Sequence, residues 1–341
     1  MVKVTISDVA EKAGVSKSTV SQYLSKRYQH MGTDTRSKIE QAIEELDYQP
    51  NVLARSLKQK RTSTVGVIVA NIMHQLSTEI CRGIEDYCQE QDINVILCNS
   101  DEDGGKEQKY AEMLQAKQVD GIILLPTGKN TALYAKLAKH KYPILFMDRR
   151  VEGVKADTIV VNNRESIYAA VAHLAEQGHR QIAIATAPLT ISSRVERTEG
   201  YRKAMDDLGL GYSERMIINA EISSLKDRFR ELFTGAEAPT ALIAGNDLVL
   251  LEILAVVKEQ GMRVPDDLAL VAFDNIPFAH LLTPTLTTIN QPSLEMGRKA
   301  AELILRRIRS EAEDLEPTEL VFPCELAIRE SSELILHNSG T

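Results

Sequence analysis

The sequence lacks any long uninterrupted run of apolar residues. Residues 1–24 contain none of the length that a signal peptide needs, and no stretch is long and apolar enough to cross a bilayer. We therefore expect a cytoplasmic protein without a membrane partner. Its 341 residues, 43% hydrophobic and 26% charged, are typical of a soluble globular protein with more than one domain.

Patterns of metal-binding and redox proteins are also missing. The cysteines show no CxxC spacing, and the seven histidines form neither HxH nor HExxH. The cysteines are expected to be small core residues, and we expect no metal site and no cofactor. These cysteines are Cys81, Cys88, Cys98 and Cys324.

Signatures of common enzymes are absent as well. No GxGxxG follows a predicted strand, and "LLPTGKN" (124–130) lacks the earlier glycine of a P-loop. No Ser–His–Asp or Cys–His order is apparent. We therefore predict that the protein is not an enzyme.

Positive charge is scarce overall but concentrated near the N-terminus. The formal net charge is −8, yet residues 1–61 carry 11 Lys and Arg against 7 Asp and Glu. The remaining residues carry 29 against 41. A basic head on an acidic body is typical of a nucleic-acid-binding head.

The head reads as short helices around a tight corner. In "TISDVAEKAGVSKSTVSQYL" (5–24), Ser7 is the expected N-cap of the first helix, and Gly14 can adopt the positive φ of the corner. Ser16 is expected to cap a second helix, and a third follows at about 33–46. This pattern predicts a three-helix, helix-turn-helix head.

The side of the second helix that faces away from the apolar residues is short and polar. Gln22 can make two hydrogen bonds to an adenine edge, and Lys17 can reach guanine acceptors. We therefore predict that this helix enters the major groove; a capped surface helix without a partner is the alternative. The predicted DNA contacts are Ser16, Lys17, Ser18, Ser21 and Gln22.

A basic segment, "YQPNVLARSLKQKRTS" (48–63), follows the third helix. Pro50 should end that helix, and Asn51 can cap a further one that is too short to be stable alone. A leucine on it would be exposed unless a partner buries it, for example between base steps of the minor groove. A flexible basic linker is the alternative. The predicted DNA contacts of this hinge are Arg55, Ser56, Leu57 and Lys58.

The motifs "DVAEKAGVSKSTVS" (8–21) and "PNVLARSL" (50–57) resemble the lactose-repressor/galactose-repressor (LacI/GalR) family of bacterial transcription regulators. The resemblance covers essentially the whole chain, which is also similar to ketodeoxygluconate-type repressors. It implies a homodimer whose paired hinge helices insert a leucine, here Leu57, at the centre of a palindromic operator. Family members usually carry arginine at the position of Gln22, so a different half-site is expected.

Continuous apolar stretches alternate with helical patterns from Val65 onward, and the same order restarts after residue 163. Such strands indicate parallel sheets covered on both faces. The predicted fold class is α/β: a helix-turn-helix head and hinge helix, then two doubly wound parallel-sheet lobes, of the periplasmic-binding-protein type that the resemblance implies. The predicted domains are 1–49 (head), 50–62 (hinge helix and linker), 63–161 with 290–322 (first lobe) and 162–289 with 323–341 (second lobe).

Polar residues follow several predicted strands. Ligands bind beyond the carboxyl ends of such strands, where carboxylates, amides and arginines can bond a small molecule. Helix capping is the alternative, for which Asp247 is an example. The resemblance favours a ligand role for several of these residues, Arg197, Asn246 and Asp274 foremost. The predicted ligand-binding residues are His74, Ser77, Asp148, Arg149, Ser193, Arg194, Arg197, Asn246, Asp274 and Gln291.

The charge of the ligand is a separate question. Four arginines, at 149, 150, 194 and 197, are many cations for a neutral sugar, and they favour a sugar acid such as a uronate or a 2-keto-3-deoxy sugar acid. A phosphorylated effector is the rival. "HQLST" (74–78) stands where many family members have paired aromatic residues, which argues against a stacked neutral hexose.

We therefore predict a sequence-specific DNA-binding repressor of carbohydrate-use genes that a sugar or sugar-acid inducer releases from its operator. Sugar binding would shift the arrangement of the lobes and unfold the hinge helices. A repressor that needs a corepressor, and a sugar-binding protein without a DNA role, are the alternatives.

Overall fold

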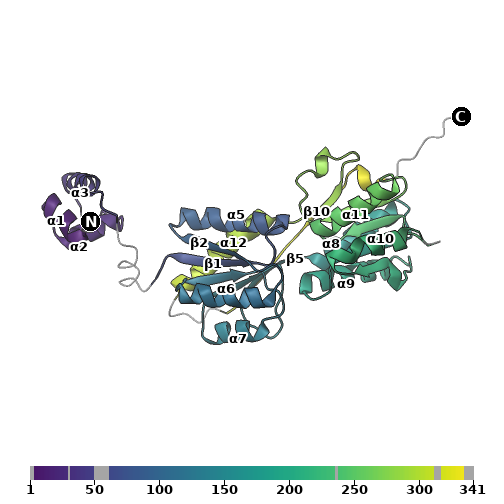
Figure 1. The fold of residues 1–341 in the computed structure, drawn as a ribbon, viewed down its shortest axis with the longest axis horizontal. Helices are drawn as coiled ribbons and strands as arrows, with labels where there is room; N and C mark the ends of the chain where they lie inside the picture. The colour runs from purple at the N-terminus through teal and green to yellow at the C-terminus, as the bar shows by residue number, and fades with distance from the viewer. Residues whose placement is uncertain (1–3, 30, 50–60, 235–236, 311–315, 334–341) are drawn as a thin grey trace. The chain divides into compact units, whose positions relative to one another are not determined.

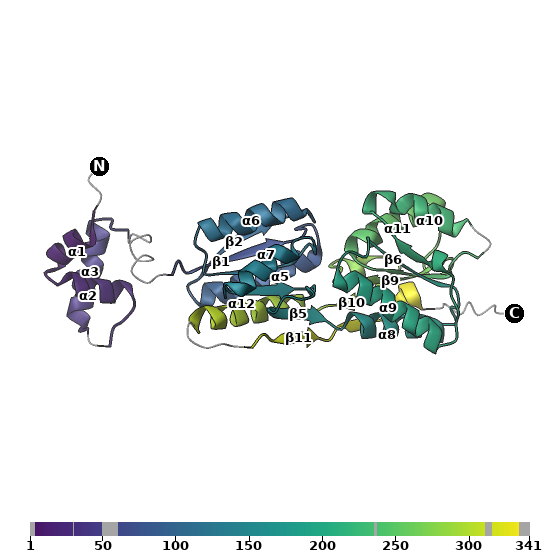
Figure 2. The same ribbon diagram turned by 90° about the horizontal axis from the view of Figure 1, so that it is seen from below.

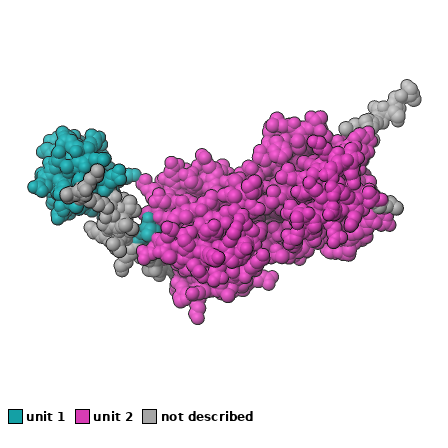
Figure 3. Space-filling view, viewed as in Figure 1, with its two compact units in different colours: residues 1–62 teal, residues 63–341 magenta. Residues whose placement is uncertain are grey.

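The computed structural model divides the chain into two compact units, residues 1–62 and 63–341 (Figure 3). It describes residues 4–29, 31–49, 61–234, 237–310 and 316–333. The hinge residues predicted to contact DNA, Arg55, Ser56, Leu57 and Lys58, lie outside these ranges.

The first unit is the predicted three-helix head, with α1 (Ile6–Ala13), α2 (Lys17–Leu24) and α3 (Thr33–Glu45). Val9, Val20 and Ile39, one from each helix, are fully buried in its small core. Gly14 ends α1 with φ of 65°, a conformation that costs glycine little, and so forms the predicted corner.

One capping prediction for the head is wrong. Helix α1 begins two residues earlier than Ser7 implies, with Thr5 as its N-cap. The backbone N–H and the hydroxyl of Thr5 both donate to the Asp8 carboxylate, at 2.7 and 2.8 Å. Thr5 and Asp8 have the spacing of a capping box, which satisfies the free end of the helix better than Ser7 would.

The second unit contains two six-stranded sheets, each covered by helices on both faces (Figures 1 and 2). The first sheet has the order β11-β5-β4-β3-β1-β2, and its paired strands all run parallel. Its strands are β1 (Thr64–Val69), β2 (Asn94–Asn99), β3 (Gly121–Leu124), β4 (Ile144–Met147), β5 (Asp157–Val161) and β11 (Glu319–Phe322). Its helices are α5 (Gln75–Glu90), α6 (Gly104–Ala116), α7 (Thr131–Lys139) and α12 (Ser293–Arg309).

The second sheet has the order β12-β10-β9-β8-β6-β7, and β12 runs antiparallel to β10. Its strands are β6 (Ile182–Thr186), β7 (Ile217–Asn219), β8 (Ala241–Ala244), β9 (Ala269–Phe273), β10 (Thr287–Asn290) and β12 (Glu325–Ala327). Its α-helices are α8 (Asn163–Glu176), α9 (Ser192–Asp207), α10 (Leu225–Phe233) and α11 (Asp247–Gln260). Short 3₁₀ turns lie at Glu214–Met216, Ile222–Ser224, Ala279–Leu281 and Glu330–Ser332.

Successive residues of a strand pack against the helices on opposite faces of the sheet, which explains the continuous apolar runs in the sequence. Val67 packs toward α5 and α12, whereas its neighbour Ile68 packs toward α6 and α7. Both are fully buried. Sheets covered on both faces require this pattern.

Helices α5 and α12 approach each other closely because each has a glycine at the contact. A Cβ on Gly83 would lie 2.1 Å from the Leu294 carbonyl oxygen, and one on Gly297 would lie 2.2 Å from that of Ile80. Ala300, Ala301 and Leu303 to Leu305 of α12 are buried within the chain.

The chain passes between the two sheets after β5, after β10 and after β11. The carboxyl ends of the parallel strands of both lobes therefore meet where these segments cross (Figure 2). In the parts of the chain that the structure describes, no helix is long and apolar enough to cross a membrane.

Candidate functional site

Helix α2 exposes most of the side chains predicted to contact DNA. Lys17, Ser18 and Gln22 are exposed and Ser21 is partly exposed, while Val20 on the opposite side is fully buried. A helix with a short polar face and a buried apolar side can approach a major groove closely.

Ser16 has a different position from the other predicted residues of α2. Its hydroxyl accepts a hydrogen bond from the Thr19 backbone N–H at 3.2 Å and lies 2.6 Å from the Ser18 hydroxyl. Ser16 therefore caps the helix, as the sequence predicts, and the exposed polar face is formed mainly by the residues after it.

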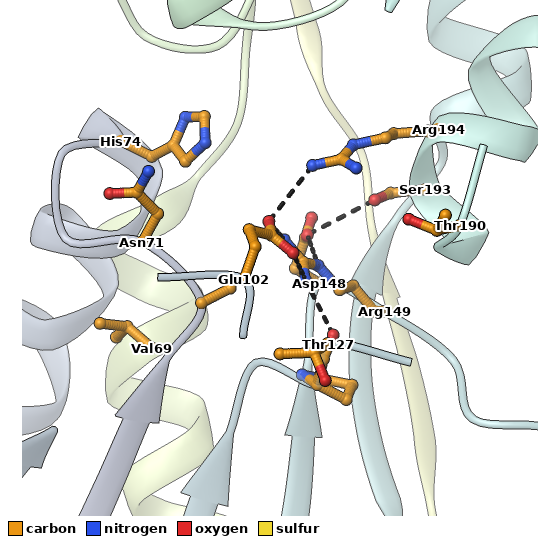
Figure 4. A network of polar contacts seen from close by, with 12 residues as sticks. Val69, Asn71, His74, Glu102, Thr127, Asp148, Arg149, Thr190, Ser193 and Arg194 are labelled. Carbon is orange, nitrogen blue, oxygen red and sulfur yellow. Dashed lines mark hydrogen bonds and ion pairs between the residues drawn. The ribbon is translucent and has the colours of Figure 1, made fainter. Parts of the chain in front are cut away.

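A cavity of about 180 Å³ lies between the two lobes of the second unit. Figure 4 shows Arg194, Ser193 and Thr190 approaching from one lobe and Asn71, His74 and Glu102 from the other. The cavity is lined by Asn71, His74, Glu102, Thr127, Lys129, Ala187, Pro188, Thr190, Arg194, Glu221, Ile222, Asn246 and Leu248.

The carboxylate of Glu102 joins two arginines at this cavity. It accepts hydrogen bonds from Arg149 Nη2 at 2.7 Å and Nη1 at 3.1 Å, and from Arg194 Nη2 at 3.2 Å (Figure 4). Burial by itself raises the pKa of Glu102. The charge of Arg149, its hydrogen bonds to Glu102 and the charges of Arg194 and His74 together outweigh burial, so the pKa lies below its usual value. Glu102 is therefore ionised at neutral pH and links the two lobes.

Arg197 forms hydrogen bonds and a cation–π contact with other residues of the second lobe. Its Nε donates to Asn163 Oδ1 at 2.9 Å and its Nη1 to the Gly245 carbonyl oxygen at 2.6 Å. Its guanidinium carbon lies 3.6 Å from the centre of the Phe273 ring. Among the described residues no ion pair joins Arg197 to Asp274, although both are buried in the same lobe.

Asp274 is a buried carboxylate with few compensating charges. Its oxygens accept from Gln291 Nε2 at 2.6 Å and from the Asp247 backbone N–H at 3.2 Å. Burial raises the pKa of Asp274 to about 6, against the lowering influence of Arg197. Its φ of 89° is unusual for a residue with a side chain, a strain found mainly at binding sites.

His74 and Asp247 join the lobes on another side of the cavity. His74 Nδ1 lies 2.5 Å from Asp247 Oδ1, and the backbone N–H of Gln75 donates to Asp247 Oδ2 at 2.8 Å. Burial lowers the pKa of His74, but the hydrogen bond to Asp247 and the charges of Asp247 and Asp274 together raise it above its usual value. Asp247 therefore caps the start of helix α5, which belongs to the other lobe. The expected capping role of this residue is thus exerted on a helix across the cavity.

The same region contains a possible cation-binding group. His74, Asp247 and Asp274 each place a ligand atom within 4.8 Å of the others. Their carboxylates already accept the N–H groups of Gln75, Leu248 and Asp247.

Two buried acceptors in this region have no hydrogen-bond partner among the described residues, Asp148 Oδ1 and Gln291 Oε1. Asp148 and Gln291 are only 5% and 3% exposed. An acceptor left unsatisfied in a buried site is costly, so both atoms are suited to a ligand that donates hydrogen bonds.

The structure brings most of the predicted ligand-binding residues to the facing ends of the lobes. His74, Arg194 and Asn246 line the cavity, and Ser193 Oγ lies 3.5 Å from Asp148 Oδ2. Ser77 is buried in the first turns of α5 and does not line the cavity. Arg150 forms ion pairs with Glu196 and Glu319. Its charge is therefore not available to an acidic ligand.

Sequence reasoning missed several lining residues, of which Glu102 and Thr127 are the most informative. They follow strands β2 and β3, and the rule that ligands bind beyond the carboxyl ends of parallel strands would have indicated them. Asn71, Lys129 and Thr190 were missed as well.

A helix-turn-helix head and a two-lobed α/β body with a polar cavity define a class of DNA-binding regulators. Residues 5–51 match the model of the lacI family of bacterial regulatory proteins, and residues 171–332 match a periplasmic binding protein-like domain. The chain belongs to the lacI family and is a DNA-binding transcription regulator.

Three similar proteins support this assignment. The "Probable HTH-type transcriptional regulator EndR" of Paenibacillus polymyxa is 44% identical, over 92% of this chain and 93% of the relative. A solved complex of the transcriptional regulator CelR with cellobiose is 30% identical, covering 96% of this chain and 99% of that one, with a TM-score of 0.72. The Lac repressor dimer bound to operator and the anti-inducer ONPF is 25% identical, covering 97% and 99%, with a TM-score of 0.82.

Proposed function

We propose that this regulator is a repressor whose operator affinity is controlled by a small sugar-type ligand bound between its lobes. The observation that carries the proposal is the polar cavity between the lobes. Asp148 Oδ1 and Gln291 Oε1, whose residues are not part of its lining, are buried acceptors without a partner among the described residues. Hydroxyl groups of a sugar would satisfy both acceptors. The CelR complex with cellobiose is a similar chain holding a sugar.

Ligand binding would change the operator affinity through the contacts that join the lobes. Glu102 with Arg194 and His74 with Asp247 are such contacts. A ligand that binds better to one arrangement of these groups shifts the population toward it. The first candidate is an inducer, a ligand that lowers operator affinity and so relieves repression. A corepressor, which raises operator affinity, is the second candidate, because the solved Lac repressor structure holds an anti-inducer together with its operator.

The DNA contacts are assigned to α2 and to the hinge. Lys17, Ser18, Ser21 and Gln22 would reach base edges and phosphates, and Ser16 would hold the helix in place. Arg55, Ser56, Leu57 and Lys58 are proposed to contact the centre of the operator. Binding would take place in the cytoplasm, where bacterial operator DNA is found.

The regulator is proposed to act as a homodimer on a palindromic operator, since a two-fold axis in the protein matches one in the DNA. Large apolar side chains that would remain in water on a monomer are suited to the subunit contact. Met73 and Leu281 are 75% and 73% exposed, and Leu251 is 51% exposed. Sedimentation at low protein concentration should show a dimer, whereas a stable tetramer would contradict this assignment.

The proposed division of the chain is unchanged from the sequence. The head covers 1–49, the hinge helix and linker 50–62, the first lobe 63–161 with 290–322, and the second lobe 162–289 with 323–341.

The test begins with selection of binding sites from random double-stranded DNA by the full chain. We expect a palindromic sequence, and anisotropy titrations should then show that a sugar in a panel including cellobiose changes the affinity for it. Failure to enrich any sequence would contradict the DNA-binding role. Enrichment without a response to any sugar or sugar acid would contradict the proposed effector class.

A further inference from the structure

We propose that Glu102 is a built-in anion that occupies the cationic part of the effector cavity and makes the site selective for uncharged, hydroxyl-bearing ligands. The inference rests on the proposed function, because it names the ligand class of the same cavity. It assigns a specificity role to a residue that sequence reasoning did not select.

The geometry of Glu102 is that of a bound carboxylate. Both of its oxygens face the guanidinium of Arg149, at 2.7 and 3.1 Å, and one of them also accepts from Arg194 at 3.2 Å. Two N–H groups of one guanidinium on two oxygens form the arrangement by which arginine binds carboxylate ligands. Figure 4 shows this carboxylate between the two arginines. It therefore occupies the position that a ligand anion would otherwise take.

The position of Glu102 is fixed by the backbone. The residue follows β2 with φ of 57°, and its N–H donates to the Ala70 carbonyl oxygen at 2.7 Å. Arg149 is held equally firmly, because it also donates to the Pro126 carbonyl oxygen at 2.8 Å and is only 5% exposed. The pair is therefore formed before any ligand arrives.

The charges around this point balance without a ligand. Glu102 and Asp148 face Arg149 and Arg194, two carboxylates against two guanidiniums. An acidic ligand placed here would meet two carboxylates, and like charges brought together in a partly buried site repel each other. The arginines that favoured a sugar acid are thus already neutralised.

The remaining cations do not restore an anion site. Arg197 is committed to Asn163 and to the Gly245 carbonyl oxygen, and Arg150 to Glu196 and Glu319. Lys129 is exposed, and its ammonium donates to the Glu102 carbonyl oxygen at 3.2 Å. Asp148 Oδ1 and Gln291 Oε1, buried behind the residues that line the cavity, have no donor among the described residues, and an uncharged polyol would supply hydroxyl donors.

The test is a calorimetric titration of the full chain without DNA, using glucuronate and inorganic phosphate as anionic probes. Glu102→Gln keeps the shape of the side chain and removes its charge. We expect this variant to bind glucuronate at least about tenfold more tightly than the unmodified protein, because one of the two opposing carboxylates is gone. Glu102→Ala removes the carboxylate altogether and leaves both arginines without it. This variant should also bind glucuronate more tightly, and its result does not depend on how a glutamine side chain would pack.

Asp101→Asn is the matched control. It removes the same charge one residue away, but Asp101 is exposed and pairs with Lys106 at 2.6 Å rather than with the arginines of the cavity. Its affinity for glucuronate should equal that of the unmodified protein. Adding Arg194→Ala to Glu102→Gln should abolish the gain.

A gain that appears in both glutamate variants, and not in Asp101→Asn, supports the proposal. It is overturned if neither variant gains affinity for either anion, whether all forms bind equally or none binds. It is also overturned if the unmodified protein binds glucuronate more tightly than cellobiose. None of these results depends on operator DNA, so they are separate from failure of the DNA-binding role, which the site selection would reveal.

Discussion

The carboxylate of Asp247 accepts a hydrogen bond from the backbone N–H of Gln75 at 2.8 Å, and the two residues belong to different lobes. Helix α5 has no side-chain cap of its own at His74, so its first N–H group, that of Gln75, is satisfied from across the cavity. The stability of one lobe's helix end is thereby made dependent on the position of the other lobe.

Asp247→Ala should loosen the start of α5 and weaken the link between the lobes. We expect a loss of about 1–3 kcal/mol of protection at the first amides of α5, because a partly buried cap and a charged hydrogen bond disappear together. Hydrogen exchange measured by mass spectrometry over residues 71–80 checks this. Asp103→Ala is the control: Asp103 caps α6 within its own lobe, through Lys106 N–H at 2.9 Å, so that variant should loosen α6 and leave α5 protected.

Gln22→Ala should weaken binding to the cognate operator by about 1–3 kcal/mol and relax discrimination at one base position. The exposed amide at this position is suited to two hydrogen bonds with one base. Lys58→Ala should instead weaken binding to all DNA about equally, as expected for a phosphate contact. Site selection with both variants distinguishes the two roles, and unchanged specificity in Gln22→Ala would contradict the placement of α2 in the groove.

Arg197→Ala should give a repressor that binds its operator normally but no longer responds to its effector. The change leaves the buried Asn163 and Gly245 oxygens without their donor, next to the cavity and far along the chain from the head. Anisotropy titrations with and without effector measure both properties. Arg180→Ala removes an exposed arginine of the same lobe and should preserve the response; a normal response in Arg197→Ala would contradict the assigned role.

Asp274 should give the folded protein a specific dependence on pH. Its pKa is raised to about 6 by burial, against about 4 in an unfolded chain, so the folded state holds its proton more tightly. The stability that this proton contributes is fully present below about pH 4 and is lost as the pH rises through 6. Arg197, Asp247 and His74 face the same carboxylate and modify this shift.

Melting temperatures of the unmodified protein and of Asp274→Asn, measured from pH 4 to 8, provide the test. The difference between the two should change in favour of the asparagine variant as the pH rises toward 6, and stay constant above it. A difference that does not vary with pH would show that Asp274 titrates at its ordinary value.

The sequence was sufficient for the features that depend on local pattern. Continuous apolar strands predicted two covered parallel sheets, and the capped helix after Gly14 predicted the head, because each pattern has few structural solutions. The pairing of Arg149 with Glu102 was not predicted. Nothing local relates residue 102 to residue 149; they meet because strands β2 and β4 end at the same edge of one sheet.

The expectation of a charged effector rests on a count of arginines that does not consider their partners. Counting arginines treats each one as available, whereas the structure places a carboxylate or a carbonyl oxygen on Arg149, Arg150 and Arg197. Which charges cancel depends on contacts between segments that are tens to more than a hundred residues apart, and composition alone does not contain that information.

The crossings of the chain between the sheets also determine how the protein is completed during synthesis. Helix α12 and strand β11 belong to the first sheet, and β12 belongs to the second, although all three come after residue 290. A nascent chain shorter than this would have both lobes unfinished, with the edges of β5 and β10 uncovered. The head needs only its first fifty or so residues, so it can be complete on the ribosome long before the part that would regulate it.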